Sequence, residues 1–179
     1  MGKSMRKIGV ILAGGQSRRM GKDKATIIFN GQTFLDHTIQ LLKKWGSDDI
    51  VVLGRPDIPL GIRDPREGAG PAANLQAWIN TQKPPFRMAV LPVDMPLLSV
   101  TQLHKLDSNP TGGFFDDLYL PIITTIGGFL PKKVSRMKDL LSVLSLQPIA
   151  IPDAWRNELT NFNTVESIRR LCVDSNPTQ

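Results

Sequence analysis

The residues best suited to chemistry are concentrated in one glycine-rich stretch near the N-terminus. The stretch reads Leu12-Ala13-Gly14-Gly15-Gln16-Ser17-Arg18-Arg19-Met20-Gly21-Lys22-Asp23-Lys24. Glycines let backbone N–H groups approach a polyphosphate closely. Arg19 can bind phosphate oxygens as a fork, and Lys24 can act as a mobile point charge. The stretch therefore predicts a phosphate-binding loop; the alternative is an ordinary strand-to-helix loop with surface arginines.

This stretch is not a P-loop. Five residues, rather than four, separate Gly15 from Gly21, and Asp23 stands where that motif needs Ser or Thr. The phosphate loop predicted here must therefore be of another kind.

A second candidate is Asp94, which directly follows an apolar run of strand length. Carboxylate oxygens are ligands that Mg²⁺ prefers, together with water and substrate phosphates. Beside a phosphate loop, Asp94 is therefore a candidate metal ligand. The alternative is a surface aspartate before a turn, which Pro92 and Pro96 would favour.

The charge distribution points to a compact anion site. The 179 residues carry a net charge of +6, and residues 1–24 account for all of it, with seven basic residues and one acidic residue. A nucleic-acid-binding protein usually spreads its basic residues along a face or groove. The distribution thus favours a phosphate site over a polyanion track, and we expect no nucleic-acid partner.

The composition, with 41% hydrophobic and 21% charged residues, is that of a globular protein. The length predicts a single domain over residues 1–179, with flexible ends at 1–6 and 175–179. A single cysteine excludes an intramolecular disulfide framework, and two histidines argue against a His-rich metal site. No secretory signal or membrane span is apparent, so we expect a cytoplasmic protein without a membrane partner.

Apolar periodicity and capping residues predict alternating strands and helices. Strands are expected over residues 7–13, 25–29, 49–53, 87–93 and 147–151, with further β structure over 112–125. Helices are expected over residues 34–45, 71–80 and 134–145, from Ser99 onward, and over 163–173.

This alternation predicts an α/β fold with a mainly parallel, Rossmann-like sheet and helices on both faces. Such sheets bind ligands beyond the carboxyl ends of their strands. Gly14 and Asp94 both follow predicted strands, so we expect the phosphate loop and the candidate metal ligand at the same edge of the sheet.

The glycine-rich stretch closely resembles the signature Leu-Ala-Gly-Gly-x-Ser-x-Arg-Met-Gly-x-Asp-Lys of the molybdenum cofactor guanylyltransferases (MobA), a branch of the nucleotidyltransferases. The resemblance continues along most of the chain, and its further motifs are Asp64 with Gly70-Pro71-Ala72-Ala73, Leu91-Pro92-Val93-Asp94-Met95-Pro96, Ser135-Arg136 and Asn161-Phe162-Asn163-Thr164. It implies a fold like that of the nucleotide-diphospho-sugar transferases.

The resemblance implies transfer of GMP from GTP to the phosphate of Mo-molybdopterin, with release of pyrophosphate and with Mg²⁺ as cofactor. The implied catalytic residues are Arg19, Lys24 and Asp94, with Asp94 as metal ligand. The implied GTP contacts are Leu12, Ala13, Gly14, Gly15, Arg19, Lys24, Asp64 and Asp94. Asn161 and Asn163 would lie on the pyrophosphate or acceptor side. Transient contact with proteins that insert molybdopterin or mature molybdoenzymes is also expected.

Some of these residues have a simpler interpretation, and three positions depart from the family pattern. Asp64 also suits a turn before Pro65, and Asn163 suits a helix cap paired with Glu166. The departures are Leu53-Gly54 where the family has Asn, Asn74 where it has Gly, and leucine in Tyr119-Leu120-Pro121 where some members have His. Asn74 would put a side chain where the backbone of the family passes close.

The departures leave other functions open. One is a cytidylyltransferase acting on molybdopterin, although Gly14 directly before Gly15 argues for guanine. Others are a nucleotidyltransferase that charges a sugar or alditol phosphate, and a nucleotide-binding module without turnover.

Overall fold

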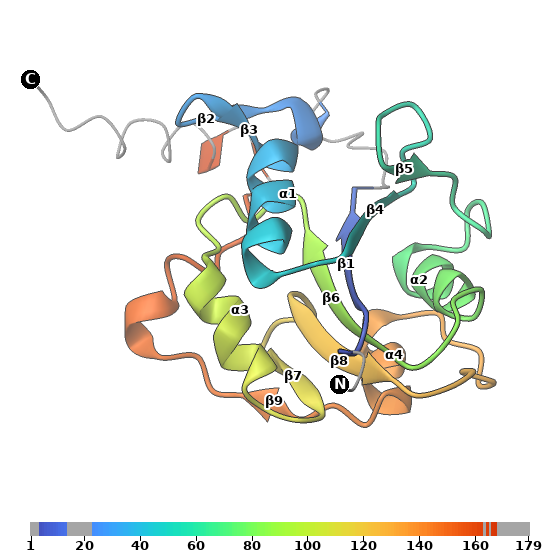
Figure 1. The fold of residues 1–179 in the computed structure, drawn as a ribbon. Helices are drawn as coiled ribbons and strands as arrows, with labels where there is room; N and C mark the ends of the chain where they lie inside the picture. The colour runs from blue at the N-terminus through green and yellow to red at the C-terminus, as the bar shows by residue number, and fades with distance from the viewer. Residues whose placement is uncertain (1–3, 14–22, 163, 165, 168–179) are drawn as a thin grey trace, which may run out of the picture.

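The computed structural model describes residues 4–13, 23–162, 164, 166 and 167. They form a seven-stranded sheet in the order β5-β4-β1-β6-β8-β7-β9 (Figure 1). Its strands are β1 (Lys7–Leu12), β4 (Asp49–Leu53), β5 (Gly61–Ile62), β6 (Phe86–Pro92), β7 (Gly112–Phe115), β8 (Ile122–Ile126) and β9 (Pro148–Ile149). Only β8 runs against the direction of the other strands of this sheet. The predicted mainly parallel sheet is therefore confirmed.

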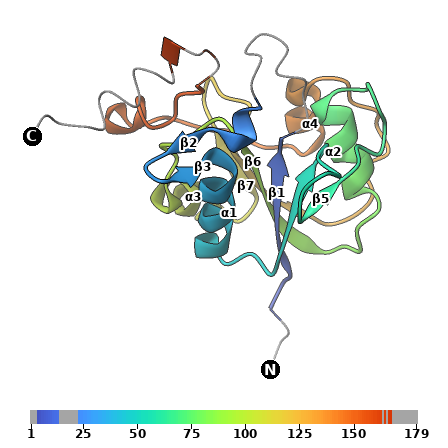
Figure 2. The ribbon, with the colours of Figure 1, turned by 90° about the horizontal axis from the view of Figure 1, so that it is seen from above.

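Helices cover both faces of the sheet, as Figure 2 shows from above. Helices α1 (Phe34–Trp45) and α3 (Val100–Asp107) pack on one face. Helices α2 (Pro71–Ile79) and α4 (Met137–Val143) pack on the other. The hydrophobic core is accordingly divided into two clusters, one on each side of the sheet, and the predicted α/β architecture is confirmed.

Local sequence explains where α1 begins and ends. The Thr33 side chain accepts a hydrogen bond from the Asp36 N–H, which satisfies one of the free donors of the first turn. Gly46 takes the left-handed conformation, with φ of 92°, and ends the helix. Between these caps, one face of α1 is apolar and buried, so the prediction for residues 34–45 is confirmed.

The strand predicted over residues 25–29 is wrong for its first half. The Asp23 carboxylate accepts a hydrogen bond from the Ala25 N–H at 3.0 Å and begins a 3-10 helix, η1 (Lys24–Thr26). Only β2 (Ile28–Phe29) is extended, and it pairs with β3 (Gln32–Thr33) in a separate two-stranded sheet.

The C-terminal part differs in length from the prediction. Helix α4 and strand β9 are shorter than predicted, and η2 (Asp153–Trp155) is a 3-10 turn that the sequence did not indicate. The predicted helix over 163–173 falls mostly outside the described residues. Among the described residues, no helix is long and apolar enough to cross a membrane.

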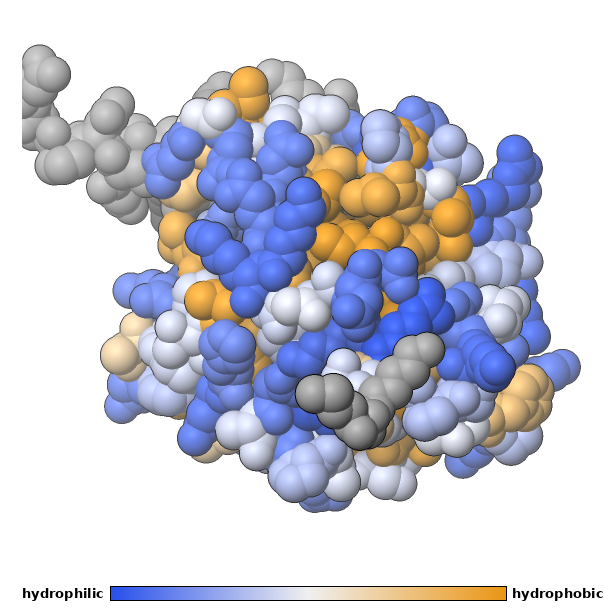
Figure 3. Space-filling view, viewed as in Figure 1, coloured by the Kyte–Doolittle hydropathy of each residue, from blue (hydrophilic) through white to orange (hydrophobic). Residues whose placement is uncertain are grey.

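The lateral side of the sheet along β4 is only partly covered by another strand. Strand β5 pairs with Val52 and Leu53 of β4, and the first half of β4 pairs with β1 alone. Figure 3 shows an apolar area beside α1, over this edge. The segment that joins β4 to β5 contributes Leu60, whose exposed fraction is 48%.

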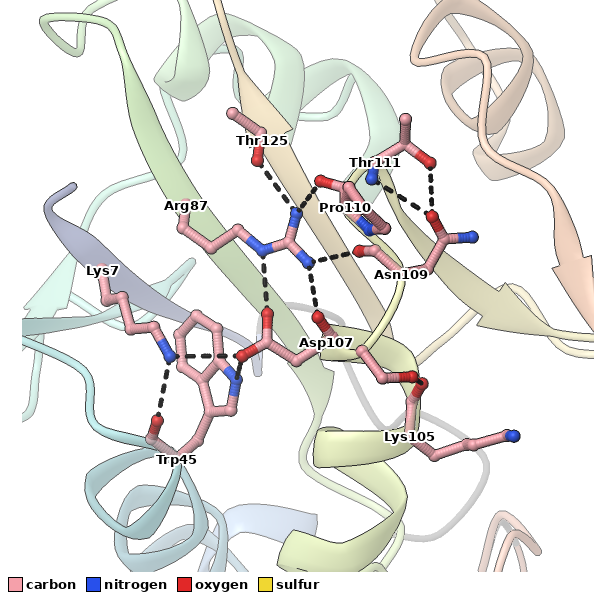
Figure 4. Close-up of polar contacts among 10 residues, drawn as sticks. Lys7, Trp45, Arg87, Lys105, Asp107, Asn109, Pro110, Thr111 and Thr125 are labelled. Atoms are coloured by element: carbon pink, nitrogen blue, oxygen red, sulfur yellow. Dashed lines mark hydrogen bonds and ion pairs between the residues drawn. The ribbon is translucent and has the colours of Figure 1, made fainter. Parts of the chain in front are cut away.

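A charged network closes the edge of the sheet where the parallel strands begin (Figure 4). Arg87 of β6 donates hydrogen bonds to the Asp107 carboxylate at 2.9 Å, to the Thr125 hydroxyl and to the backbone carbonyls of Asp107, Asn109 and Pro110. Lys7 and the Trp45 indole N–H both bond the second oxygen of Asp107. Arg87 thereby joins β6 to the end of α3 and to β8.

Candidate active site

The site lies at the opposite edge, where β4, β1 and β6 end side by side. Lys24 of η1 and Asp94, two residues beyond β6, come together there. The Lys24 Nζ atom lies 2.7 Å from the Asp94 Oδ2 atom. The exposed fractions of the two side chains are 17% and 16%, so the pair is shielded but still reaches solvent. A basic and an acidic residue of the predicted site therefore meet.

Asp94 is held in place by the strand before it and by the C-terminal segment. Strand β6 is buried along its whole length, and Val93 and Met95 on either side of Asp94 are also buried. The Asp94 carbonyl oxygen accepts a hydrogen bond from the Phe162 N–H at 2.9 Å. Because the backbone on both sides is anchored, the carboxylate projects from a fixed point.

Lys24 owes its position to η1. The Ala25 side chain is buried in the core cluster beneath α1, and the Thr26 N–H and hydroxyl both bond the Asp23 carbonyl oxygen. A single 3-10 turn thus presents Lys24 to the end of β6.

Arg55 adds a further ion pair at this edge that sequence analysis missed. It follows Gly54, whose φ of 80° turns the chain just after β4. The Arg55 NH1 atom lies 2.7 Å from the Asp23 carboxylate, and its Nε and NH2 atoms contact the Asp57 carboxylate. The one available signal was an arginine placed directly after a strand and a glycine.

Asp64 lies in the segment between β5 and α2, at the same edge. Its side chain is half-buried; burial raises the pKa of the Asp64 carboxyl, and the charge of Glu67 raises it further. Desolvation favours the neutral form of a carboxyl, and so does a nearby like charge. Asp64 therefore lies at the same edge as Lys24 and Asp94, with a carboxyl that is partly shielded from water.

Asn74 does not project into the site, contrary to the concern raised by its replacement of a glycine. The side chain is 3% exposed; it accepts a hydrogen bond from the Arg66 N–H at 2.7 Å and donates one to the Gly70 carbonyl at 3.1 Å. These bonds tie the segment before α2 to the helix. Asn74 therefore stabilises the segment that precedes α2 and is not exposed at this edge.

Leu53, the last residue of β4, lies at this edge, but its side chain faces the core. It is 2% exposed and packs in the core cluster on the α2 side of the sheet. The departure at Leu53-Gly54 therefore leaves no apolar side chain in the site, and Arg55 is the first side chain beyond β4 that reaches the edge.

The other predicted residues divide into two groups. Leu12 and Ala13, half-buried at the end of β1, and the exposed Asn161, next to Phe162, lie at this edge. Gly14, Gly15, Arg19 and Asn163 lie outside the described residues.

The residues present fit a metal ion that is held jointly with a substrate. Among the described residues, no group of three or more His, Cys, Asp or Glu side chains is arranged to hold a metal ion. Asp94 offers one carboxylate that already faces a cation, the Lys24 ammonium. Mg²⁺ typically takes one or two protein carboxylates and fills its remaining positions with water and phosphate oxygens. The single Asp94 carboxylate meets this requirement when a substrate supplies the phosphate oxygens.

Comparison with known proteins places these observations in a family. Residues 9–113 match the model of the MobA-like NTP transferase domain. A molybdenum cofactor guanylyltransferase from Xanthomonas euvesicatoria pv. vesicatoria is 32% identical to this chain, over 94% of this chain and 95% of the relative.

Solved structures share the fold. A nucleotidyl transferase from a Methanothermobacter species superimposes with a TM-score of 0.70 at 17% identity, covering 97% of this chain and all of that one. A Mycobacterium tuberculosis protein solved in complex with manganese gives a TM-score of 0.62 at 15% identity, covering 94% and 99% of the two chains. Sequence and fold agree, and the chain belongs to the MobA-like NTP transferase family.

Proposed function

We propose that this protein transfers the guanylyl group of GTP to the phosphate of Mo-molybdopterin and releases pyrophosphate. The observation that supports this most directly is the Lys24–Asp94 contact of 2.7 Å at the carboxyl edge of the sheet. It brings together the cation that we propose for phosphate binding and the carboxylate that we propose for metal binding. The 32% identity to a curated guanylyltransferase along nearly the whole chain supports guanine and molybdopterin as the substrates.

The chemistry needs charge neutralisation rather than a protein nucleophile. A phosphate oxygen of the acceptor attacks the α-phosphorus of GTP, a new P–O bond forms, and the bond to the β-phosphate breaks. Both reactants are anions, so the protein must offset repulsion and hold the attack in line. Arg19 and Lys24 are proposed to bind the triphosphate, together with backbone N–H groups of Gly14 and Gly15.

Asp94 is proposed to hold a divalent ion, Mg²⁺ in the cell. When bound, such an ion polarises the phosphate and orients the triphosphate. The manganese complex of the Mycobacterium tuberculosis protein supports a divalent ion in this fold. The contribution of Asp94 itself is a fixed carboxylate, since its backbone is anchored by β6 and Phe162.

The base and the acceptor are assigned to opposite sides of this pair. Guanine presents N1–H and N2–H₂ donors that one carboxylate can accept together, and Asp64 is the proposed acceptor of both. Leu12 and Ala13 are proposed to contact the nucleoside through their backbone. Asn161 and Asn163 are proposed to face the pyrophosphate and the molybdopterin, because Phe162 between them bonds the Asp94 carbonyl.

The decisive experiment offers the purified protein GTP, CTP or UTP with Mg²⁺ and Mo-molybdopterin. Pyrophosphate release and the mass of the dinucleotide product are measured. We expect turnover with GTP and little with CTP or UTP. Preference for CTP would indicate a cytidylyltransferase, and turnover only when a sugar phosphate replaces Mo-molybdopterin would indicate a different acceptor. GTP binding without pyrophosphate release under any condition would indicate a binding module and overturn the proposal.

The proposed reaction also suggests where the protein works. GTP is a cytoplasmic nucleotide, and a chain with one cysteine needs no oxidising compartment. We therefore place the reaction in the cytoplasm, with transient handover of molybdopterin from an inserting protein and of product to a maturing enzyme. Affinity capture with the product-loaded protein would test that handover.

A further inference from the structure

We propose that Arg55 is a positioning residue for Lys24, acting through its ion pair with Asp23. This inference rests on the proposed function, in which Lys24 binds the triphosphate. The feature that carries it is η1, where two consecutive residues form ion pairs in different directions. Asp23 pairs with Arg55 at the end of β4, and Lys24 pairs with Asp94 beyond the end of β6, each at 2.7 Å.

The order of the strands in the sheet shows which parts of the fold these two ion pairs connect. Strand β1 lies between β4 and β6 in the sheet, and the glycine-rich stretch continues from the end of β1. Turn η1, at the far end of that stretch, is thus tied to the two strands that flank β1. Removing Arg55 takes away the tie of this turn to β4, and removing the Asp94 carboxylate takes away its tie to the end of β6.

Arg55 is itself a rigid anchor. The backbone N–H groups of Gly54 and Arg55 both donate to the Ile62 carbonyl of β5. Gly61 passes so close that a Cβ atom there would lie 1.6 Å from the Arg55 carbonyl oxygen. The Arg55 side chain is 15% exposed, whereas that of Asp57 is 60% exposed. A guanidinium on such a backbone can fix its partner in space.

Asp23 transmits this anchoring to the turn. One carboxylate oxygen accepts the Ala25 N–H and starts η1, and the other contacts Arg55. The same carboxylate therefore caps the turn and ties it to β4. Without Arg55, Asp23 can still cap the turn, but the orientation of its carboxylate is no longer fixed. Because Lys24 directly follows Asp23, its position is then less well fixed as well.

The competing interpretation is that Arg55 only stabilises the segment between β4 and β5 through Asp57. The two interactions use different atoms: NH1 contacts Asp23, and Nε and NH2 contact Asp57. They can therefore be removed separately. Asp57→Asn removes the charged partner within the segment and leaves the contact with Asp23 available, so it is the matched control for Arg55→Gln.

The experiment measures GTP binding with Mg²⁺ by calorimetry, steady-state kinetics with the acceptor, and thermal melting. Arg55→Gln and Asp23→Asn should each weaken GTP binding and lower kcat/KM by about tenfold, and the double variant should be no worse than either, because both remove one interaction. Arg55→Lys should recover part of the loss. Asp57→Asn should change both quantities by less than about twofold, as expected for an exposed pair.

A second background tests whether Arg55 acts through Lys24. In Lys24→Met, the further change Arg55→Gln should leave the remaining GTP affinity unchanged. Full GTP affinity in Arg55→Gln, equal losses in Arg55→Gln and Asp57→Asn, or additive losses with Lys24→Met would each overturn the positioning role. If Lys24→Met itself binds GTP as tightly as the parent protein, the proposed triphosphate site fails instead, so the two failures are distinguishable.

Discussion

The two edges of the sheet place similar charged pairs in different surroundings. At the edge where the parallel strands begin, Arg87 and Asp107 have side chains that are 9% and 20% exposed. At the edge where they end, Lys24 and Asp94 have comparable exposures of 17% and 16%. Burial alone therefore does not distinguish the structural pair from the pair that we propose to bind substrate.

The difference lies in the partners. The Arg87 guanidinium donates hydrogen bonds to three backbone carbonyls, a hydroxyl and a carboxylate. All of these acceptors lie on secondary structure or on the turn after α3. Lys24 and Asp94 join one short 3-10 turn to the chain just beyond a strand. The planar Arg87 guanidinium, with all its hydrogen bonds made to the surrounding chain, stabilises the fold. The Lys24 ammonium, on a flexible stem, can exchange one anionic partner for another. The comparison teaches that the kind of partner separates the two pairs: backbone carbonyls hold Arg87, and a carboxylate just beyond a strand end faces Lys24.

The largest expected effect is on stability, from Arg87→Met. The substitution removes the guanidinium donor of the partly buried Asp107 carboxylate and of the Asp107, Asn109 and Pro110 carbonyls. We expect the free energy of unfolding to fall by about 3–5 kcal/mol in urea denaturation. The control is Arg6→Met, whose exposed pair with Asp49 should contribute under about 1 kcal/mol. Equal losses of unfolding free energy in the two variants would contradict the structural role given to Arg87.

The next effect is on turnover, from Asp94→Asn. The amide keeps the size of the side chain but loses the charge that is proposed to hold the metal ion. We expect pyrophosphate release to fall by at least about 100-fold while the melting temperature changes little. Asp153→Asn, at a carboxylate that is 96% exposed, is the control and should remain active. A variant of Asp94 that unfolds like the Arg87 variant would show that both edges are structural.

A smaller effect is expected on base selection, from Asp64→Asn. Inosine triphosphate lacks the N2 amine of GTP, so the parent protein should favour GTP by about tenfold in kcat/KM. The variant should lose most of that preference. Because burial and Glu67 raise the pKa of Asp64, the parent should also lose the preference on acidification, at a higher pH than an ordinary aspartate would. An unchanged preference in the variant would remove Asp64 from base recognition.

The smallest effect is a pH dependence at the structural edge. Burial alone would raise the pKa of Asp107, but hydrogen bonds from Arg87 and Lys7 outweigh it and hold that pKa below its usual range. The resulting stabilisation is complete above the unfolded-state pKa of about 3.9 and is lost as the pH falls through the lower folded-state value. Urea denaturation between pH 6 and pH 2 should therefore show the difference between parent and Asp107→Asn shrinking with acid. A difference that grows on acidification would contradict this sign.

The sequence predicted the sheet and one half of the site for a physical reason. In a parallel sheet, the ends of neighbouring strands meet at one edge, so the end of β1 and the aspartate after β6 were expected at the same edge. Caps such as Thr33 and the Ser99–Gln102 capping box are local in sequence, and both are present in the structure.

What the sequence could not reveal depends on contacts between distant residues. Arg55 looks like any surface arginine until its partner Asp23 is known, and Asn74 looked intrusive until its bonds to the preceding segment were seen. The apolar, β-branched run after Lys24 predicted a strand, but the Asp23 side chain bonds the Ala25 N–H and starts a turn instead.

The hydrogen bond from Phe162 to Asp94 has a consequence for how the protein could be dissected. The family model matches residues 9–113, yet β6 pairs with β8 over five residues, and the Asp94 carbonyl accepts a hydrogen bond from the Phe162 N–H. A piece limited to residues 9–113 would expose one side of β6 and lose the bond that anchors the Asp94 backbone. The span that the family model matches is thus shorter than the smallest piece that we expect to fold alone.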